Sequence, residues 1–229
     1  MLNDYPFLES FLTGLISGFL VSIPVGPINV TIIHEGAERG FRWAVFIGAG
    51  SVLMEAIYCA IGFAGFSELF TTDIAKATLQ LASFALMSYL GFKYLLAKEV
   101  KTSSRSADRI EERLHPHTAF MTGFVRTLGN PGVLLLWIAL SATFLAHDWV
   151  DPNWTSKSIC IAGVASGGLA WFTLLSYVVS IGHRHLSDKT LLNMSRSAGG
   201  MLLVAALALG YKLALLLADV VKHAGTPSP

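Results

Sequence analysis

The chain has 229 residues, of which 53% are hydrophobic and only 14% are charged, and its net charge is +1. A typical soluble domain is about 25% charged, so the composition argues against a soluble enzyme, and the near-neutral balance argues against a nucleic-acid partner. The mean hydropathy of +0.59 indicates a membrane protein. Cys59 and Cys160 cannot form a disulfide scaffold. Both lie in apolar runs, where cysteine behaves as a small hydrophobic residue.

Long apolar stretches separated by short polar breaks run through the sequence. A helix needs about 20 consecutive apolar residues to cross a bilayer. The segments that meet this length are 8–33, 43–66, 74–97, 118–146, 158–182 and 197–221. The predicted fold is therefore an all-α membrane protein with six transmembrane helices. In the first of them, small residues at every fourth position (Gly14, Gly18, Ser22 and Gly26) are typical of close helix contact.

The charged residues divide the chain into two halves. Nine of the 16 basic and 15 acidic residues lie between Lys98 and Arg113. We therefore expect a first three-helix repeat over residues 1–97, a hydrophilic linker over 98–117 and a second three-helix repeat over 118–229.

Basic residues in the loops predict how the chain is oriented. The first, third and fifth loops carry ten lysines and arginines, whereas the other loops and the termini carry three. Because basic loops face the cytoplasm, we expect the linker on the cytoplasmic side of the inner membrane and both termini outside.

Weak sequence matches relate the two halves in the same order. Residues 17–24 resemble 122–129, residues 90–93 resemble 209–212, and Gly48 and Ser51 match Gly163 and Ser166. A repeat of three spans has an odd number of crossings, so the second copy must enter the membrane upside down. Such three-plus-three inverted repeats are typical of secondary transporters with a substrate site near the bilayer midplane.

Each half begins with a span that proline interrupts near its middle. The first break contains Gly26, Pro27 and Asn29, and the second contains Asn130 and Pro131. Proline inside a helix costs about 3 kcal/mol or more, and asparagine followed by proline is a favoured helix start. Each break thus predicts a new half-helix whose first N–H groups suit an anion, such as a substrate carboxylate. The alternative is a pair of proline kinks that serve packing.

Glu55 and Arg126 are the charged residues at membrane depth that need an explanation. Glu55 lies midway along the second span, on a helical face with Gly48, Ser51, Tyr58 and Gly62. A carboxylate there is costly and needs a partner or a proton. Its functional role is that of a counter-ion for a substrate ammonium group or of a proton carrier. The alternative is a structural ion pair with Arg126. Arg126 lies one turn before the second break and either reaches the central cavity or extends to the inner surface.

The sequence carries no pattern for a metal, a cofactor or an enzyme. Its seven histidines are not placed beside carboxylates or thiols within a span, whereas metal sites need converging ligands. No phosphate-binding loop, nucleophile–base pair or carboxylate dyad is present. We therefore expect neither an enzyme nor a bound metal or cofactor.

At Gly26-Pro27-Ile28-Asn29 the sequence resembles the lysine exporter (LysE) family, which includes the threonine/homoserine exporter (RhtB) branch. Further matches follow in order along nearly the whole chain: Glu55 with Gly65, Gly91-Phe92-Lys93, Gly123-Phe124 and Asn130-Pro131. The resemblance implies a small six-span exporter of amino acids. The chain departs from the family pattern at Gly132, where lysine is usual, at Arg126 and Thr127, and in carrying Glu rather than Asp at position 55.

These features predict a proton-coupled exporter of an amino acid or similar zwitterion that works by alternating access. The expected substrate-binding residues are Gly26, Pro27, Asn29, Glu55, Arg126, Asn130 and Pro131, with Glu55 also the candidate for proton coupling. One alternative is a metal-ion exporter, because Cys59 lies four residues from Glu55. Another is a membrane scaffold subunit that transports nothing. The expected partners are a small amino acid and the lipid bilayer, with no nucleic acid. The sequence is also compatible with a homo-oligomer.

Overall fold

The computed structural model describes residues 6–24, 26–66, 73–98 and 118–182, and positions 189–211 other than 191, 194, 198, 201, 202, 205, 208 and 209. The predicted linker, apart from Lys98, lies outside the described residues, and so does Lys212. Every secondary-structure element in the described residues is helical, which agrees with the predicted all-α fold class.

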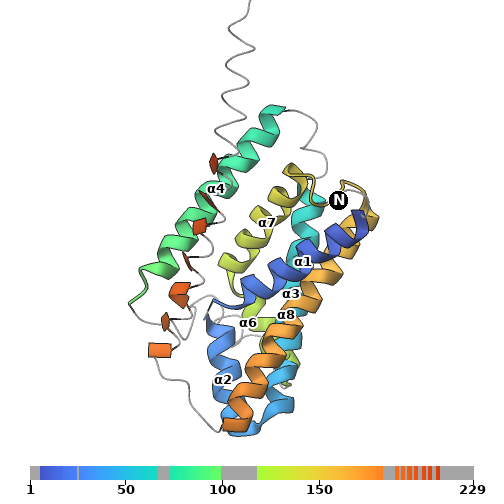
Figure 1. The fold of residues 1–229 in the computed structure, drawn as a ribbon. Helices are drawn as coiled ribbons and strands as arrows, with labels where there is room; N and C mark the ends of the chain where they lie inside the picture. The colour runs from blue at the N-terminus through green and yellow to red at the C-terminus, as the bar shows by residue number, and fades with distance from the viewer. Residues whose placement is uncertain are drawn as a thin grey trace, which may run out of the picture.

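The helices follow the first five predicted spans in chain order (Figure 1), whereas much of the sixth, over 197–221, lies outside the described residues. They are α1 (Pro6–Ser22), α2 (Pro27–Arg39), α3 (Phe41–Phe66), α4 (Asp73–Leu95), α6 (Ala119–Leu128), α7 (Pro131–Ala146) and α8 (Trp154–Gly182). Helices α3 and α8 are each long and apolar enough to cross a membrane. The pairs α1–α2 and α6–α7 bend by 73° and 72° at the predicted breaks, so each pair fits a single broken span.

Helix α8 begins four residues before the predicted span, at Trp154. The Oδ1 atom of Asn153 accepts a hydrogen bond from the Ser156 N–H at 2.8 Å. Asparagine at this position caps the first turn of a helix. The capping residue thus lies in the polar loop around residue 150. The predicted start, which used apolar content alone, was therefore too far along the chain.

Glycines allow α1 and α8 to touch through their backbones. A Cβ atom added at Gly18 would lie 2.3 Å from the carbonyl oxygen of Val164, and one added at Gly167 would lie 2.1 Å from that of Leu15. Any side chain at these positions would push the helices apart. The role in close helix contact predicted for Gly14 and Gly18 is therefore confirmed.

The same kind of contact joins α3 to α6. A Cβ atom added at Gly123 would lie 1.8 Å from the carbonyl oxygen of Ile47, and one added at Gly50 would lie 1.9 Å from that of Phe120. Helix α3 also packs against α2, α7 and α8. It therefore stands at the centre of the described bundle.

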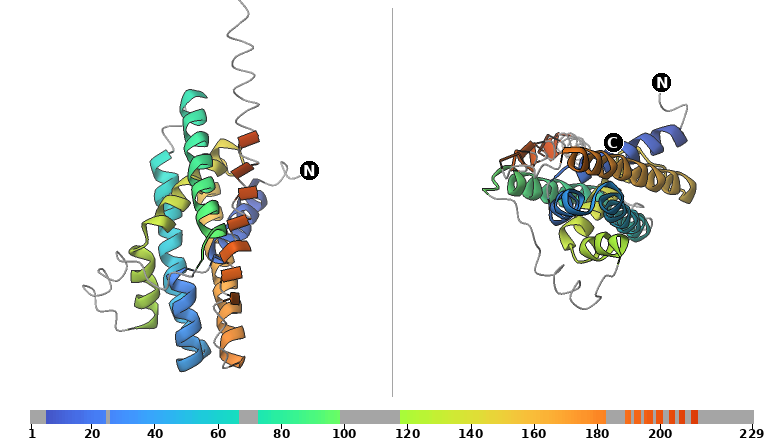
Figure 2. Two further views of the ribbon diagram at one scale, coloured as in Figure 1. Left: turned by 90° about the vertical axis from the view of Figure 1, so that its left-hand side faces the viewer. Right: turned by 90° about the horizontal axis from the view of Figure 1, so that it is seen from below.

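Helix α4 packs beside the segment that follows residue 188. A Cβ atom added at Gly91 of α4 would lie 2.7 Å from Cγ of Leu203, and one added at Gly210 would lie 2.8 Å from Cε2 of Phe84. Figure 2 shows the described positions of this segment alongside α4.

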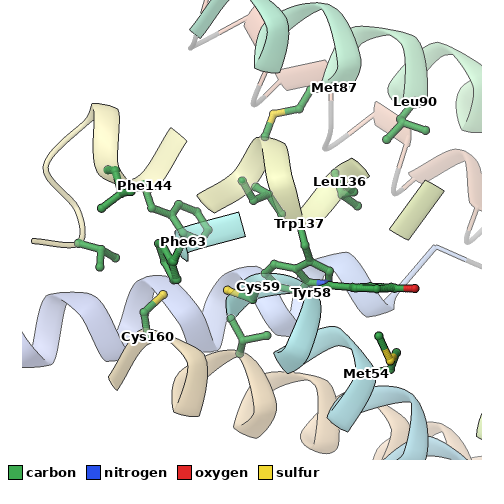
Figure 3. Close-up of a cluster of buried hydrophobic side chains, with 14 of the residues drawn as sticks. Met54, Tyr58, Cys59, Phe63, Met87, Leu90, Leu136, Trp137, Phe144 and Cys160 are labelled. Atoms are coloured by element: carbon green, nitrogen blue, oxygen red, sulfur yellow. The ribbon is translucent and has the colours of Figure 1, made fainter. Parts of the chain in front are cut away.

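Two clusters of buried side chains form the core between the helices. The larger one joins α3, α4, α7 and α8 and includes Phe63, Trp137 and Phe144 (Figure 3). Cys59 and Cys160 lie in this cluster as fully buried free thiols, which confirms that they act as small hydrophobic residues. The second cluster joins α2, α3, α6 and α8.

Replacing Gly18 or Gly123 by alanine is expected to destabilise the protein. The new methyl group would overlap a carbonyl oxygen of the neighbouring helix, and overpacking of this kind costs about 1–3 kcal/mol. The measurement is the thermal midpoint of the purified variants in detergent, which should fall by several degrees. Gly65→Ala is the matched control, because its Cβ would meet nothing within 4 Å. Midpoints equal to that of the control would contradict the close contacts.

Candidate functional site

The two breaks lie on the wall of one small polar cavity. Its volume is about 60 Å³, and roughly 10–15 Å³ already suffices for one water molecule. The side chains with polar groups in its lining are Ser22, Asn29, Ser51, Glu55, Tyr94, Thr127 and Asn130. Because these residues come from both halves of the chain, the cavity lies where the two halves meet.

The structure brings five of the seven predicted site residues to this cavity, namely Gly26, Pro27, Asn29, Glu55 and Asn130. Pro131 and Arg126 are not in the lining. Pro131 follows Asn130 as the first residue of α7, and it shapes the break without facing the cavity.

Asn29 holds the first break together. Its Nδ2 donates to the carbonyl oxygens of Ser22 at 2.9 Å and Pro24 at 2.8 Å, which the interrupted helix leaves without intrahelical partners. Its Oδ1 accepts from the indole N–H of Trp171 on α8 at 3.1 Å. Both Nδ2 hydrogens are thus used. Asn29 therefore fixes the cavity wall and keeps one oxygen lone pair for a ligand.

Asn130 caps the second break, as its sequence context predicts. Its Oδ1 accepts from the Gly132 N–H at 3.1 Å, and Pro131 is the first residue of α7. Within the described part of the chain, the Nδ2 group of Asn130 donates to no acceptor. This NH₂ group is available to a ligand in the cavity.

Helix α2 begins without such a cap. Its N-cap residue is Gly26, which has no side chain to accept from the first turn, and Pro27 follows at the first helical position. A Cβ atom added at Gly26 would meet nothing within 4 Å. Gly26 therefore leaves open space beside the cavity, unlike Gly18, which serves close packing. Of the two half-helix starts, that of α2 is the more accessible to an anion.

Glu55 supplies the carboxyl group among the described residues that line the cavity. The side chain is 5% exposed, and its Oε1 accepts from the Ser51 hydroxyl at 3.2 Å. Its Oε2 is buried and has no partner at hydrogen-bonding distance and angle among the described residues, although the indole N–H of Trp137 lies nearby. A buried polar atom without a partner is unfavourable, so this oxygen is a place for an ammonium group or a proton.

A chain of hydroxyl groups links Glu55 to the end of α6. The Ser51 Oγ lies 2.8 Å from the Thr127 Oγ1, and the Tyr58 hydroxyl donates to the Leu128 carbonyl at 2.8 Å. Ser51 and Tyr58 are on the face predicted for Glu55, but Thr127 is a partner that sequence reasoning missed. The only signal was its position three residues before Asn130, and a pairing across 76 positions needs the tertiary structure.

Arg126 lies behind the cavity wall and contacts the first break. Its guanidinium group donates to the Oγ1 atom of Thr31 on α2. That hydroxyl donates in turn to the Pro27 carbonyl at 2.7 Å. Arg126 thus links α6 to the start of α2. Glu55 bonds instead to Ser51 within α3, so these hydrogen bonds of the two residues go to different partners.

The thiol of Cys59 does not join Glu55 at the cavity. Its Sγ lies 3.8 Å from the Ser141 hydroxyl inside the hydrophobic core. Across the described residues, no three His, Cys, Asp or Glu side chains converge as metal ligands. The geometry therefore offers the metal-exporter alternative no support.

An apolar helical bundle with two broken helices beside one cavity is the arrangement typical of secondary transporters. The model of the LysE type translocator family matches residues 19–213. The chain therefore belongs to the LysE type translocator family, and it is an integral membrane transporter.

Two of the three relatives described here carry names of efflux or export proteins. YcgF of Bacillus subtilis, whose name describes amino acid efflux, is 28% identical over 207 residues, or 90% of this chain and 97% of YcgF. The lysine exporter LysE of Corynebacterium efficiens is 24% identical over 206 residues, or 79% of this chain and 89% of that protein. The chemotactic transduction protein ChpE of Pseudomonas aeruginosa is 26% identical over 164 residues, or 72% of this chain and 79% of ChpE. No solved structure matches the chain.

Substitutions at Asn130 should separate its capping role from its role at the cavity. Asn130→Ala removes the cap of α7 and is expected to cost about 1 kcal/mol of stability. Asn130→Asp keeps the capping oxygen but replaces the NH₂ group, so it should retain a near-native thermal midpoint and lose substrate affinity. Thermal midpoints and a substrate-binding titration of both variants check this. Unchanged affinity in Asn130→Asp would show that the NH₂ group does not meet the substrate.

Proposed function

We propose that this protein exports an amino acid across the cytoplasmic membrane by alternating access around the cavity. The observation that carries the proposal is the cavity between the two breaks, which has Glu55 and the uncapped start of α2 on its wall. The direction of transport is taken from the relatives named for amino acid efflux and lysine export.

The cavity suits the two charged ends of a zwitterion. The N-terminal end of α2 carries partial positive charge, so it and the Asn130 amide would hold the substrate carboxylate, as half-helix ends do in other transporters. The buried Oε2 of Glu55 would accept from the substrate ammonium group. Asn29 and Arg126 would act as positioning residues, because they hold the first break from either side.

An inverted repeat is supported by contacts that recur between the halves. The matching pairs are Gly18–Val164 with Gly123–Ile47, Gly167–Leu15 with Gly50–Phe120, and Gly91–Leu203 with Gly210–Phe84. One set of shifts relates all three: 105 positions for the first and fourth spans, 117 for the second and fifth, and 119 for the third and sixth. The matches of residues 17–24 and 90–93 follow these shifts. The match of Gly48 with Gly163 does not, since Gly48 now corresponds to position 165.

The same contacts indicate which helices would move together. Backbone contact at glycine joins α1 to α8 and α3 to α6, whereas α3 and α8 meet through side chains such as Val52 and Phe172. Close-packed pairs move as units, and shear takes place where side chains can repack. We therefore assign α1 with α8 to one moving unit and α3 with α6 to the other. The cavity lies between them.

Proton coupling and orientation complete the proposal. Glu55 would carry the coupled proton when no ammonium group occupies its Oε2, and the proton motive force would supply the energy because the sequence has no nucleotide-binding motif. The basic linker over 98–117 would face the cytoplasm, with both termini outside.

A scaffold subunit, the remaining alternative, would not need the polar cavity.

Glu55→Gln is expected to lower transport at least about tenfold, which corresponds to roughly 1.4 kcal/mol of lost interaction. Glutamine can still accept from Ser51, so the variant should fold, but it cannot neutralise an ammonium group or carry a proton. The measurement is amino acid uptake into inverted membrane vesicles under an imposed proton gradient. Glu38→Gln is the control, because that side chain is exposed on α2. Transport by Glu55→Gln at the rate of the control would overturn the role of Glu55.

A disulfide between the two units is expected to stop transport. A Cβ atom at position 168 lies 3.9 Å from the Cβ of Val52, within the roughly 3.5–4.5 Å that a disulfide requires. Val52→Cys with Gly168→Cys, in a background without Cys59 and Cys160, should lose transport on oxidation and regain it on reduction. The single-cysteine variants are the controls. Full transport by the oxidised, cross-linked protein would refute motion between α3 and α8.

A further inference from the structure

The cavity combines one carboxyl group with an apolar wall. Apart from the polar groups described above, the side chains that line it include Val21, Ile28, Val133, Leu136 and Phe172. These residues come from α1, α2, α7 and α8, so apolar groups approach from several sides. A substrate side chain in this cavity would therefore meet hydrocarbon.

Among the described helices, Glu55 is the acidic residue that lies away from the helix ends. Besides Glu55, the acidic residues of the described helices lie near helix ends: Glu9, Glu35, Glu38 and Asp73. Glu35 and Glu38 pair with Arg39 and His34 within α2. The sequence from 189 to 211, whose described positions pack beside α4, contains no Asp or Glu.

The described lining of the cavity also contains no lysine, arginine or histidine. Arg126 is the nearest candidate, and its guanidinium group is engaged with Thr31 outside the lining. The polar ends of the cavity thus supply one negative partner at Glu55 and one positive partner at the start of α2. This balance matches a molecule with one ammonium group and one carboxylate.

We infer that the transported amino acid has a small, neutral, largely apolar side chain, and that lysine and the acidic amino acids are poor substrates. The inference rests on the proposed function. Lysine would bring a second ammonium group, and glutamate a second carboxylate, into a wall that offers neither a partner, and an unpaired buried charge is strongly unfavourable. The cavity volume of about 60 Å³ further favours a short side chain. In this respect the chain would differ from the lysine exporters among its relatives.

The test is competition in inverted vesicles that contain the full-length protein. Uptake of labelled alanine is measured with unlabelled alanine, valine, threonine, lysine or glutamate as competitor. Alanine, valine and threonine should compete, whereas lysine and glutamate should need at least about tenfold higher concentrations. Lysine or glutamate competing as well as valine would overturn the inference while leaving amino acid export intact. If no amino acid is taken up, both the export function and this inference are refuted.

A charge introduced into the apolar wall gives an independent test. Val133 lines the cavity on α7, one turn after Asn130. Val133→Asp should raise the ratio of lysine to alanine transport at least about tenfold, because it supplies the second carboxylate. Val133→Asn, of nearly the same size but neutral, is the matched control. Detergent-solubilised variants are first compared with wild type by size-exclusion chromatography. An unchanged ratio in a folded Val133→Asp protein would count against this wall as the specificity surface.

Discussion

The structure depends on one constraint, which is that a broken helix inside a membrane must satisfy its own backbone groups. Lipid offers no hydrogen bonds, so each orphaned carbonyl or N–H group there costs several kcal/mol. At the first break Asn29 donates to the Ser22 and Pro24 carbonyls. At the second, Tyr58 donates to the Leu128 carbonyl and Asn130 caps α7. These side chains also place the two breaks around one cavity. The same hydrogen bonds therefore satisfy the interrupted backbone and position the cavity wall.

In the proposed inverted repeat, equivalent positions of the two halves carry different side chains. Under the shift of 117 positions that relates the second and fifth spans, Glu55 corresponds to Phe172, and both line the cavity. Gly26 leaves the start of α2 open, while Asn130 closes the start of α7. In the proposed mechanism, related backbones would allow two equivalent arrangements, and different side chains would give the cavity one negative and one positive partner. A zwitterion needs both properties.

Local patterns predicted the features that local physics controls. Proline fixes its own φ angle and lacks an N–H group. Both breaks and the cap at Asn130 can therefore be predicted from a few residues. The spacing of Gly48, Ser51 and Glu55 predicted a buried face because helical geometry places them together. The start of α8 was missed, since Asn153 lies in a polar loop where apolar content gives no signal. The partnership of Ser51 with Thr127 was missed because no local rule joins positions on α3 and α6.

By itself, the sequence determined that this is an all-helical membrane protein, that two of its spans are broken, and that Glu55 carries an exceptional charge. Those properties follow from hydropathy, proline and the cost of a carboxylate in lipid. Only the tertiary structure decided which side chains repair each break, that Arg126 contacts Thr31 behind the cavity wall, and that Gly26 faces open space while Gly18 touches α8. The reason is physical: a side chain's partners are set by how helices cross, and each crossing depends on contacts that are far apart along the chain.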